Sequence, residues 1–598
     1  MKWFPKSIAA ALAFSLATSP VCSFAKSAKR APSSSTTGAK KKPAERKIAA
    51  VAKAQTEITK PLLSSADETF IKAMPLKDKV GQMIFLGFNG IDIDEALGPV
   101  IENVKPGGLV MFGRNIKSAP QVAELNRAAQ AAAMKASGLP LLIGVDQEGG
   151  NVLRIKTNYP LPAALAFGQS GDADLVERAG QATGKLLHTL GYNMDLAPVL
   201  DVGDPDAARF IGTRTYGSDP AIVSMMGSAF SQGLQSEGVL PTTKHFPGHG
   251  GVNEDSHTSL PERHATLAQM EKHDLVPFES LQKSVEKSWA VMLAHVSYPD
   301  LDPSGAPASF SKPIVTDLLR TRIGFKGVVI TDDIQMAGAG LVEDVRERAV
   351  RAVEAGVDMI MITWNRKTQA AVATAIMKAV QSGRLNEARI DESVRRIVFA
   401  KRQYAPAEKK ANKDELRLAI KNPVFQTIAD EAVFSVLKKS PSKAERAYVD
   451  YAKDRPVILF SANKNFAKTF RSAASERVVR TFTLSNQQSF DVDKVMRSNP
   501  EAAGVFYVSG NQIAKIAARM GDDVAARMLV VTVEPPGIMK NAGEFKLVSD
   551  IYYRHPKLGK LIAERYFSGA EPLRSPAATG SEQRKVGEAR PPKPDLDN

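Results

Sequence analysis

Short apolar runs alternate with amphipathic segments along more than half of the chain, from about Ala66 to Tyr404. The runs are rich in Val, Ile, Leu and Met and are bounded by Gly or polar residues, as buried strands are. The candidate strands are 82–88, 107–113, 141–148, 194–202, 240–246, 289–296, 327–333 and 359–363. Between them lie helical patterns of ten or more residues, at 119–135, 173–190, 221–237 and 342–355. Eight strands with intervening helices predict a (β/α)8 barrel.

Polar residues gather at the carboxyl ends of these candidate strands. They are Asp146, Gln147 and Glu148 after the third strand, Asp201 after the fourth, Lys244 and His245 at the fifth, His295 at the sixth, and Asp332 and Asp333 at the seventh. In a barrel all of these side chains surround one mouth, which is the face where such enzymes place their chemistry. A doubly wound open sheet is the alternative fold, but it does not bring residues from so many strands to a common point.

A second alternating region follows a charged joint at 406–415. Its candidate strands lie near Pro456, Val478, Val505, Met528 and Lys546. The pattern predicts a smaller α/β sandwich with parallel strands, and it contains no Gly-rich phosphate loop, metal-ligand spacing or repeat. We therefore expect a barrel at 63–405, a linking helical region at 406–430 and a sandwich domain at 431–575.

The first 25 residues have the pattern of a secretory signal. Two lysines precede an apolar run at 8–17 that ends in small residues, and the run is too short to remain as a membrane anchor. The only cysteine, Cys22, lies in this segment, but Pro20 and Val21 before it disfavour lipid attachment. No other stretch predicts a membrane span. We expect an exported protein, periplasmic or secreted.

The formal net charge of +15 is concentrated near the N-terminus. Residues 26–60 carry ten Lys and Arg against two Glu, so the folded body is only mildly basic and a nucleic-acid partner is not indicated. The composition of 26–62 predicts a disordered linker, either simply solvated or adhering to an anionic envelope surface. The Pro-rich, charged end of the chain, 576–598, is also expected to be disordered.

The segment 244–261, KHFPGHGGVNEDSHTSLP, is the most informative part of the chain. It holds His245, His249 and His257 among glycines that let the backbone fold tightly and move over a bound molecule. This pattern indicates the acid/base loop of a hydrolase. Metal binding by His245 and His249 would need a helix, which Pro247 and the glycines oppose, so we predict no metal.

Seven sequence blocks occur in the order typical of one enzyme family. They are GGLVMFGRN at 107–115, VDQEGG at 145–150, LAPVLDV at 196–202, RTYGSDP at 214–220, KHFPGHG with the following DSH at 244–257, MLAHVSYPDLD at 292–302 and ITDDIQM at 330–336. On these blocks the chain resembles the glycoside hydrolase family 3 β-N-acetylhexosaminidases, in particular the two-domain bacterial kind. The resemblance covers the barrel well and the second domain loosely.

The resemblance implies a retaining, two-step mechanism with Asp332 as the nucleophile. Asp333 is less suited, because adjacent strand residues face opposite sides. It also implies that His257, held by Asp255, is the acid/base in place of a second carboxylate. The alternatives are that Asp332 caps the following helix and that the D-x-H pattern is surface polarity.

The resemblance further implies that Asp146 holds the hydroxyls of the sugar at the cleavage point, with Arg214, Lys244 and His245 as partners. The alternative is that these charged groups only pair with one another. His249 and His295 either line the site or are structural, and Asp195 and Asp201 either order loops or touch sugar.

Two positions depart from the family pattern: Asn151 stands where many relatives have a basic residue, and Gly251–Val252 stands where Asp-Thr is frequent. Both bear on loop packing and fine substrate preference, and neither removes a proposed catalytic group.

The function expected from these features is an exported exo-β-N-acetylglucosaminidase that needs no cofactor and acts on peptidoglycan fragments or chito-oligosaccharides. A β-glucosidase of this family would be expected to lack the DSH motif, whereas a phosphorylase differs only in the attacking group and stays open. A non-catalytic glycan-binding envelope protein would be expected to have lost Asp332 or His257, and both are present. The oligomeric state is not determined by these patterns.

Overall fold

The computed structural model describes the chain from residue 63 to residue 567 with interruptions. The interruptions are 94–96, 204–210, 253, 255, 257–258, 285–289, 341–343, 365, 405–410, 438–442, 462, 475, 485–491, 508–519, 533–547 and 551–557. The predicted signal segment 1–25, the linker 26–62 and the tail 576–598 therefore lie outside the described residues. Among the helices of the described part, none has the length and apolar character needed to cross a membrane.

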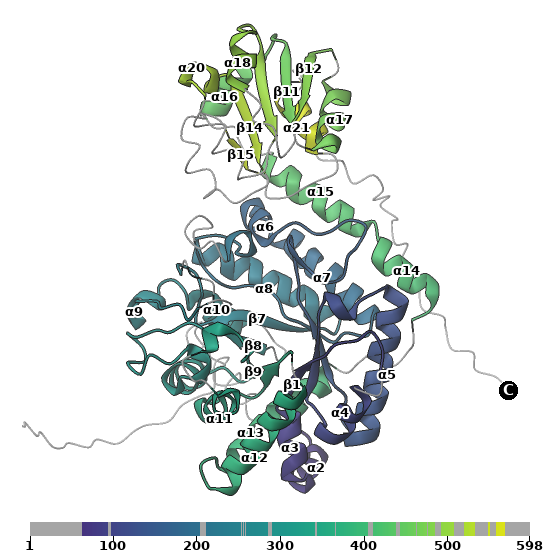
Figure 1. Ribbon diagram of the computed structural model, residues 1–598, viewed down its shortest axis with the longest axis vertical. Helices are drawn as coiled ribbons and strands as arrows, with labels where there is room; N and C mark the ends of the chain where they lie inside the picture. The colour runs from purple at the N-terminus through teal and green to yellow at the C-terminus, as the bar shows by residue number, and fades with distance from the viewer. Residues whose placement is uncertain are drawn as a thin grey trace, which may run out of the picture. The chain divides into compact units, whose positions relative to one another are not determined.

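Eight parallel strands form a barrel, as the sequence predicts (Figure 1). Their order around the wall is β10-β1-β2-β3-β6-β7-β8-β9, and a parallel bridge between Ile330 and Met359 joins β9 to β10. The strands are β1 (Ile84–Gly87), β2 (Gly108–Met111), β3 (Leu142–Val145), β6 (Met194–Asp195), β7 (Leu240–Phe246), β8 (Ala290–Leu293), β9 (Val328–Thr331) and β10 (Ile360–Ile362). Because all the strands run the same way, their carboxyl ends meet at one mouth.

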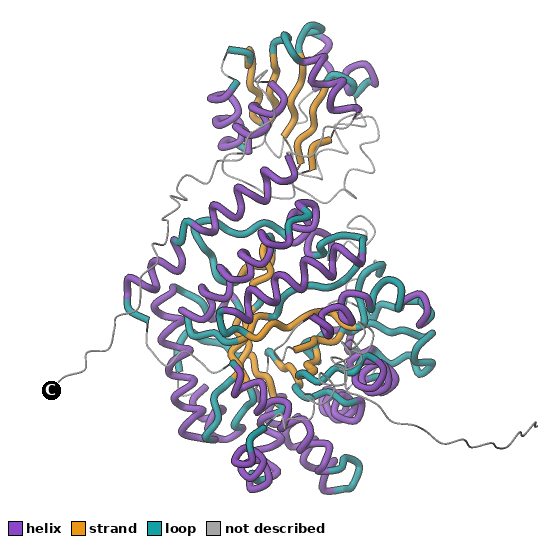
Figure 2. Tube along the Cα trace, turned by 180° about the vertical axis from the view of Figure 1, so that it is seen from behind, coloured by secondary structure: helices purple, strands orange, loops and turns teal. Residues whose placement is uncertain are grey.

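Helices surround the strands (Figure 2). They are α2 (Ser65–Ala73), α3 (Leu76–Gln82), α4 (Leu97–Val104), α5 (Ala119–Ser137), α6 (Ala164–Ser170), α7 (Ala173–Thr189), α8 (Pro220–Ser236), α9 (Leu267–Met270), α10 (Val276–Ser284), the π-helix η4 (Pro313–Arg322), α11 (Val345–Ala355), α12 (Arg366–Gln381) and α13 (Glu387–Gln403). Local signals set their ends. Helix α5, for example, begins with a capping box of Ser118 and Gln121 and ends at Gly138, whose φ is 69°.

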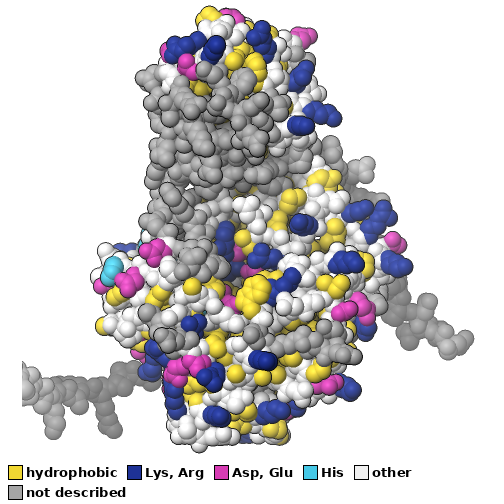
Figure 3. Space-filling view, in the orientation of Figure 1, with side chains coloured by type: hydrophobic (Ala, Val, Ile, Leu, Met, Phe, Trp, Pro, Cys, Tyr) yellow, Lys and Arg dark blue, Asp and Glu magenta, His cyan; other side chains and the backbone are white. Residues whose placement is uncertain are grey.

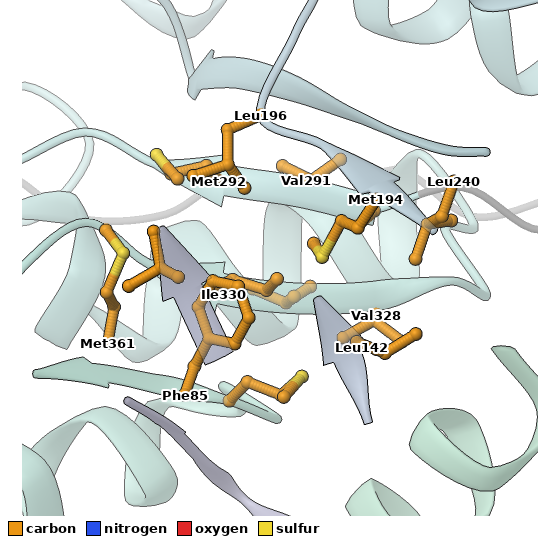
Figure 4. Packing of buried hydrophobic residues seen from close by; sticks show 14 of the residues in the cluster. Phe85, Leu142, Met194, Leu196, Leu240, Val291, Met292, Val328, Ile330 and Met361 are labelled. Atoms are coloured by element: carbon orange, nitrogen blue, oxygen red, sulfur yellow. The ribbon is translucent and has the colours of Figure 1, made fainter. Parts of the chain in front are cut away.

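The barrel interior is filled by large apolar side chains rather than left open (Figure 4). Phe85 from β1 lies fully buried among Met194, Ile330 and other inward-facing residues. Its ring fits because two neighbouring strands carry glycine. A Cβ added at Gly108 or Gly144 would lie 2.7 Å or 3.0 Å from the Phe85 ring. The interior is therefore a packed core, and a ligand can enter only at an end of the barrel.

The second region forms a five-stranded parallel sheet in the order β12-β11-β13-β14-β15, which confirms the predicted α/β sandwich. Its strands are β11 (Val457–Ser461), β12 (Val478–Thr483), β13 (Ala503–Tyr507), β14 (Met528–Thr532) and β15 (Val548–Asp550). The described helices from residue 413 onward are α14 (Lys413–Lys421), α15 (Val424–Leu437), α16 (Lys443–Ala452), α17 (Lys464–Ala473), α18 (Val492–Arg497), α20 (Asp522–Ala525) and α21 (Leu558–Phe567). Successive residues of β11 point to opposite faces of the sheet and enter separate apolar clusters, as Leu459 and Phe460 do.

Two short elements shape the barrel mouth. The connection after β3 folds into an antiparallel hairpin of β4 (Gln147–Gly149) and β5 (Val152–Leu153). The connection after β6 contains the 3-10 turn η2 (Gly212–Arg214), which carries Arg214 to the same end of the barrel. Both connections bring charged side chains toward the carboxyl ends of the strands.

Candidate active site

A pocket of about 300 Å³ opens at the carboxyl ends of the barrel strands. Its lining residues are Phe112, Asp146, Glu148, Val152, Arg154, Leu196, Arg214, Lys244, His245, Met292, Asp332, Asp333, Met336, Met361, Thr363 and Trp364. Five of the residues predicted from the sequence are among them, namely Asp146, Arg214, Lys244, His245 and Asp332. Figure 3 shows Lys and Arg side chains next to Asp and Glu side chains near the middle of the barrel region. The barrel thus gathers side chains from five different connections at one place.

Asp332 directly follows β9 and is partly exposed to the pocket. One carboxylate oxygen accepts a hydrogen bond of 2.8 Å from the backbone N–H of Asp333. Burial alone would raise the pKa of Asp332, but the nearby His295 and His245 outweigh that effect, so the pKa lies below its ordinary value. Asp332 is therefore ionised at neutral pH and available as a nucleophile.

Lys244 lies between two carboxylates on one side of the pocket. Its Nζ is 2.9 Å from Oδ1 of Asp146 and 2.7 Å from Oε1 of Glu148. Arg214 donates to both oxygens of Glu148, with Nε at 2.8 Å and Nη2 at 2.7 Å. Burial would raise the pKa of Glu148, but Arg214 and Lys244 lower it below the usual range. These groups pair with one another, as the alternative expected, and they also line the pocket.

Asp201 orders the segment that follows β7. It is fully buried, and its Oδ2 lies 2.7 Å from Nδ1 of His245. Its Oδ1 accepts from the backbone N–H groups of His245 and His249, at 3.2 Å and 2.6 Å. Burial would raise the pKa of Asp201, and the two histidines lower it. Of the two roles expected for Asp201, loop ordering or contact with sugar, its bonds support loop ordering. Its carboxylate also fixes the orientation of the His245 ring in the pocket.

Two other histidines lie outside the pocket lining. His295 is buried behind Asp332, with Nδ1 2.6 Å from Oγ of Ser309 and Nε2 3.1 Å from the carbonyl oxygen of Asp333. His249 is buried beside the loop, and burial lowers its pKa to about 4, so it is neutral at pH 7. The two rings contact other protein groups and do not line the pocket, so both histidines have structural roles. Within the described part of the chain, no three His, Cys, Asp or Glu side chains converge as metal ligands.

The predicted acid/base pair, Asp255 and His257, lies outside the described residues. Ser256, which stands between them in the sequence, is described and buried. Its carbonyl oxygen accepts a hydrogen bond of 2.8 Å from the N–H of Gly338, six residues after Asp332. Its Oγ is 3.3 Å from Nε2 of His249. Ser256 belongs to the segment after β7, and these two bonds tie it both to His249 of the same segment and to the segment after β9.

Several pocket residues were not assigned a role from the sequence. Glu148 was noted only as part of a polar cluster, although its pairing with Arg214 organises one wall. Arg154 and Trp364 were missed, and Arg154 Nη2 lies 3.3 Å from Oδ2 of Asp146. Trp364 stands just beyond the eighth strand and is 63% exposed, which is the highest value among the large apolar side chains described. Its position at a strand end is the signal that could have found it.

The arrangement can bind one polar ring and attack it. An ionised carboxylate lines a small pocket, and the lining also includes Asp146, Lys244 and Arg214, whose charged groups bond sugar hydroxyls well. A (β/α)8 barrel with such a mouth has the arrangement expected of a glycoside hydrolase.

Comparisons with known proteins give the family. The glycosyl hydrolase family 3 N terminal domain matches residues 75–400. A beta-hexosaminidase of Idiomarina loihiensis is 39% identical over 279 residues, which are 46% of this chain and 81% of that protein. The solved structure of a family 3 beta-N-acetylglucosaminidase from Paenibacillus sp. str. FPU-7 has a TM-score of 0.69 and 30% identity, covering 82% of this chain and 96% of that chain. The chain belongs to glycoside hydrolase family 3 and resembles the β-hexosaminidases of that family.

Proposed function

We propose that the protein is an exported, retaining exo-β-N-acetylglucosaminidase that releases terminal β-linked N-acetylglucosamine from peptidoglycan fragments or chito-oligosaccharides. The observation that carries the proposal is the ionised Asp332 facing the pocket that Asp146, Lys244 and Arg214 line. At about 300 Å³ the pocket is at the small end of ligand sites, which favours a single terminal sugar.

The reaction proceeds in two steps. In the first, the carboxylate of Asp332 attacks the anomeric carbon while His257 gives its proton to the glycosidic oxygen, and the leaving group departs. In the second, His257 takes a proton from water, and the resulting hydroxyl displaces the carboxylate from the sugar. Asp255 keeps the imidazole in the tautomer that both steps need.

The pocket wall formed by Asp146, Lys244 and Arg214 holds the sugar during both steps. Asp146 accepts hydrogen bonds from ring hydroxyls while Lys244 balances its charge. Arg214 and Lys244 are held as cations beside Glu148, so they also donate hydrogen bonds to the acetamido oxygen and offset the negative charge of the departing carboxylate. This wall orients the anomeric carbon toward Asp332.

A comparison of three proteins tests the chemistry. Wild type, Asp332→Ala and His257→Ala are assayed on an aryl β-N-acetylglucosaminide, with folding checked by circular dichroism. We expect Asp332→Ala to lose at least about 1,000-fold in kcat, because the bond-forming group is gone. Equal rates in all three proteins contradict the assignment.

Two further measurements test the details. Rapid quenching of the wild type should give an intact protein heavier by one N-acetylhexosamine residue, and Asp332→Ala should show no such adduct. Added phosphate should leave the product as free sugar. Formation of a sugar 1-phosphate would instead identify a phosphorylase.

The export proposal rests on the N-terminal pattern, and the substrate proposal on export together with the basic linker at 26–62. Mass measurement of the protein recovered from the cell envelope or the medium should show an N-terminus beyond residue 20. Digestion of purified wall fragments should release N-acetylglucosamine. Recovery of the full-length chain only from the cytoplasm contradicts export without touching the hydrolase assignment.

A further inference from the structure

A second cavity of about 940 Å³ adjoins the catalytic pocket. The two share Phe112, Arg154 and Trp364, so these three side chains border both cavities. We call the second cavity the basic groove. It lies between the segment after β2, the strand β5 of the mouth hairpin, and helix α14.

Most of the charged side chains that line the groove belong to lysine and arginine. Five of them are Lys117, Lys156, Lys413, Arg417 and Lys421. All five are exposed, and none forms an ion pair with another described residue. No Asp or Glu is among the described lining residues. Like charges that face a common hollow repel one another, so the groove is electrostatically complementary to an anion.

Part of the groove lining is apolar and is attached to the barrel by packing and a backbone hydrogen bond. Leu153, Ile116 and Leu416 contribute to it, and Leu416 is buried in the barrel's own apolar cluster. The carbonyl of Ile420 accepts a hydrogen bond of 3.1 Å from the N–H of Asn158 in the segment after the mouth hairpin. Helix α14 lies beyond residues 75–400, so its three cations are not part of the shared family domain.

The junction between pocket and groove is an ordered aromatic surface. The Arg114 guanidinium lies 4.4 Å from the ring centroids of both Phe112 and Trp364. Arg114 also donates to the carbonyls of Phe88 and Thr363, at 3.0 Å and 2.9 Å. Trp364 is therefore held in place although its indole is largely exposed, and it offers a flat surface to a group passing from the pocket.

We propose that the basic groove binds an anionic chain attached to the leaving part of the substrate, through its carboxylate or phosphate groups. This inference rests on the proposed function, because the leaving part emerges from the pocket only if the pocket holds the terminal sugar. The groove then acts in substrate choice. It lowers KM for acidic substrates and takes no part in bond cleavage.

A matched pair of substrates tests the proposal on the full chain. One is an N-acetylglucosaminyl saccharide whose leaving part carries a peptide with free carboxylates, and the other is the same molecule with those carboxylates amidated. We expect the wild type to prefer the free acid about tenfold in kcat/KM at low salt, mainly through KM, because several exposed ion pairs add modest energies. The preference should fade as salt screens the charges.

Two triple variants localise the effect. Lys413→Gln/Arg417→Gln/Lys421→Gln removes the cations of α14 and should abolish the preference, while turnover of a neutral aryl glycoside stays within about twofold of wild type. Lys135→Gln/Lys185→Gln/Lys272→Gln removes the same charge from exposed positions outside the groove and should keep the preference. Equal use of both substrates by wild type, or equal loss in both triple variants, overturns the proposal.

A binding measurement separates this proposal from the hydrolase assignment. Quenching of tryptophan fluorescence is titrated with the acidic peptide saccharide and, separately, with a glycerol phosphate oligomer, using Trp364→Phe as the blank. Binding that weakens about tenfold in the α14 variant supports the groove even if no substrate is turned over, and the tighter probe identifies carboxylate or phosphate as the natural group. No difference between wild type and the α14 variant for either probe overturns the groove, whatever the hydrolase activity.

Discussion

Asp332 and Asp333 are neighbours in the chain, yet their surroundings separate their protonation states. Burial would raise the pKa of Asp332, but His295 and His245 bring it below the ordinary value. Burial raises the pKa of Asp333 to about 6, even though Thr363 donates to its carboxylate. Separation of two carboxyl groups in this way is how an enzyme keeps one of them as an anion for chemistry. It explains physically why Asp332, and not Asp333, suits the role of nucleophile.

In the proposed mechanism, with His257 as the acid, the pH dependence of turnover should follow His257 rather than Asp332. Because the acid must be protonated in the first step, kcat/KM should fall about tenfold per pH unit above the pKa of the histidine. A substrate whose leaving group needs no protonation should lack this alkaline decline. The measurement is kcat/KM against pH for two aryl glycosides of different leaving-group basicity. The same decline for both would assign it to another group.

Asp201 acts on the site through His245 and is a positioning residue. Asp201→Asn replaces one of the two acceptor oxygens with an NH2 group and removes the buried negative charge beside His245, so we expect the free energy of unfolding to fall by about 2–4 kcal/mol. Turnover should also fall at least tenfold, because the His245 ring loses its acceptor. The control is Asp302→Asn, a buried carboxylate bonded to Ser311 away from the pocket, which should lose stability alone. Unfolding in urea and kcat/KM on an aryl glycoside measure the two effects.

At the level of elements, the segment after β7 is held against the segment after β6 by glycines that allow close backbone approach. A Cβ at Gly250 would lie 1.8 Å from the carbonyl oxygen of Val202, which is backbone and cannot turn aside. Gly248 has a φ of 131°, where side chains are strained. The Gly-rich composition of this segment therefore serves a fixed close contact at these two positions.

Gly250→Ala should displace this segment. We expect kcat/KM to fall at least tenfold, because His245 and the backbone bonds to Asp201 shift, while the barrel core keeps its far-ultraviolet circular dichroism. Gly98→Ala is the matched control, since its added Cβ meets only Ile93 at 3.7 Å. Wild-type turnover by Gly250→Ala would show that the segment can move without loss.

At the scale of the whole molecule, the buried charged groups at the two ends of the barrel differ in what they contact. The mouth collects the groups that face the pocket, whereas the opposite end holds groups that face only protein. There Asp358 accepts from Arg320, Arg389 and Arg396, and Lys401 donates to Gln82 at 2.6 Å. Burial lowers the pKa of Lys401 to about 7. Substitutions at this end should change stability and leave the chemistry alone.

Lys401→Met tests that division. Between pH 7 and pH 10 the unfolded chain binds a proton at Lys401 that the folded protein does not, so wild-type stability should rise with pH over this window. Removal of the amine should stabilise the protein by about 2–3 kcal/mol at pH 7, with the gain fading by pH 10. Thermal unfolding at several pH values measures this, with Lys135→Met as the exposed control. A pH-independent difference from wild type contradicts the assignment.

Much of the fold follows from local pattern. Buried strands are apolar along their length, so all eight barrel strands and the five sheet strands were predicted near their observed positions, and parallel strands in a barrel place their following residues at one mouth. Asp146, Lys244, His245 and Asp332 could be placed there for that reason alone. Arg214 was located through family resemblance, and the structure places it in the same pocket. The placement of Asp255 and His257 remains a prediction.

The partners and charges of these groups required the tertiary structure. Glu148 meets Arg214 from 66 residues away, and Lys244 reaches Asp146 across 98 residues. No local pattern encodes such pairs, because they form only when the barrel closes. The pKa values of Asp332 and Asp333, and the basic groove that α14 completes, arise in the same way. The sequence by itself determined which strands form and which residues follow them. Tertiary packing decided which of those residues meet, because burial and charge act between groups that are close in space and distant along the chain.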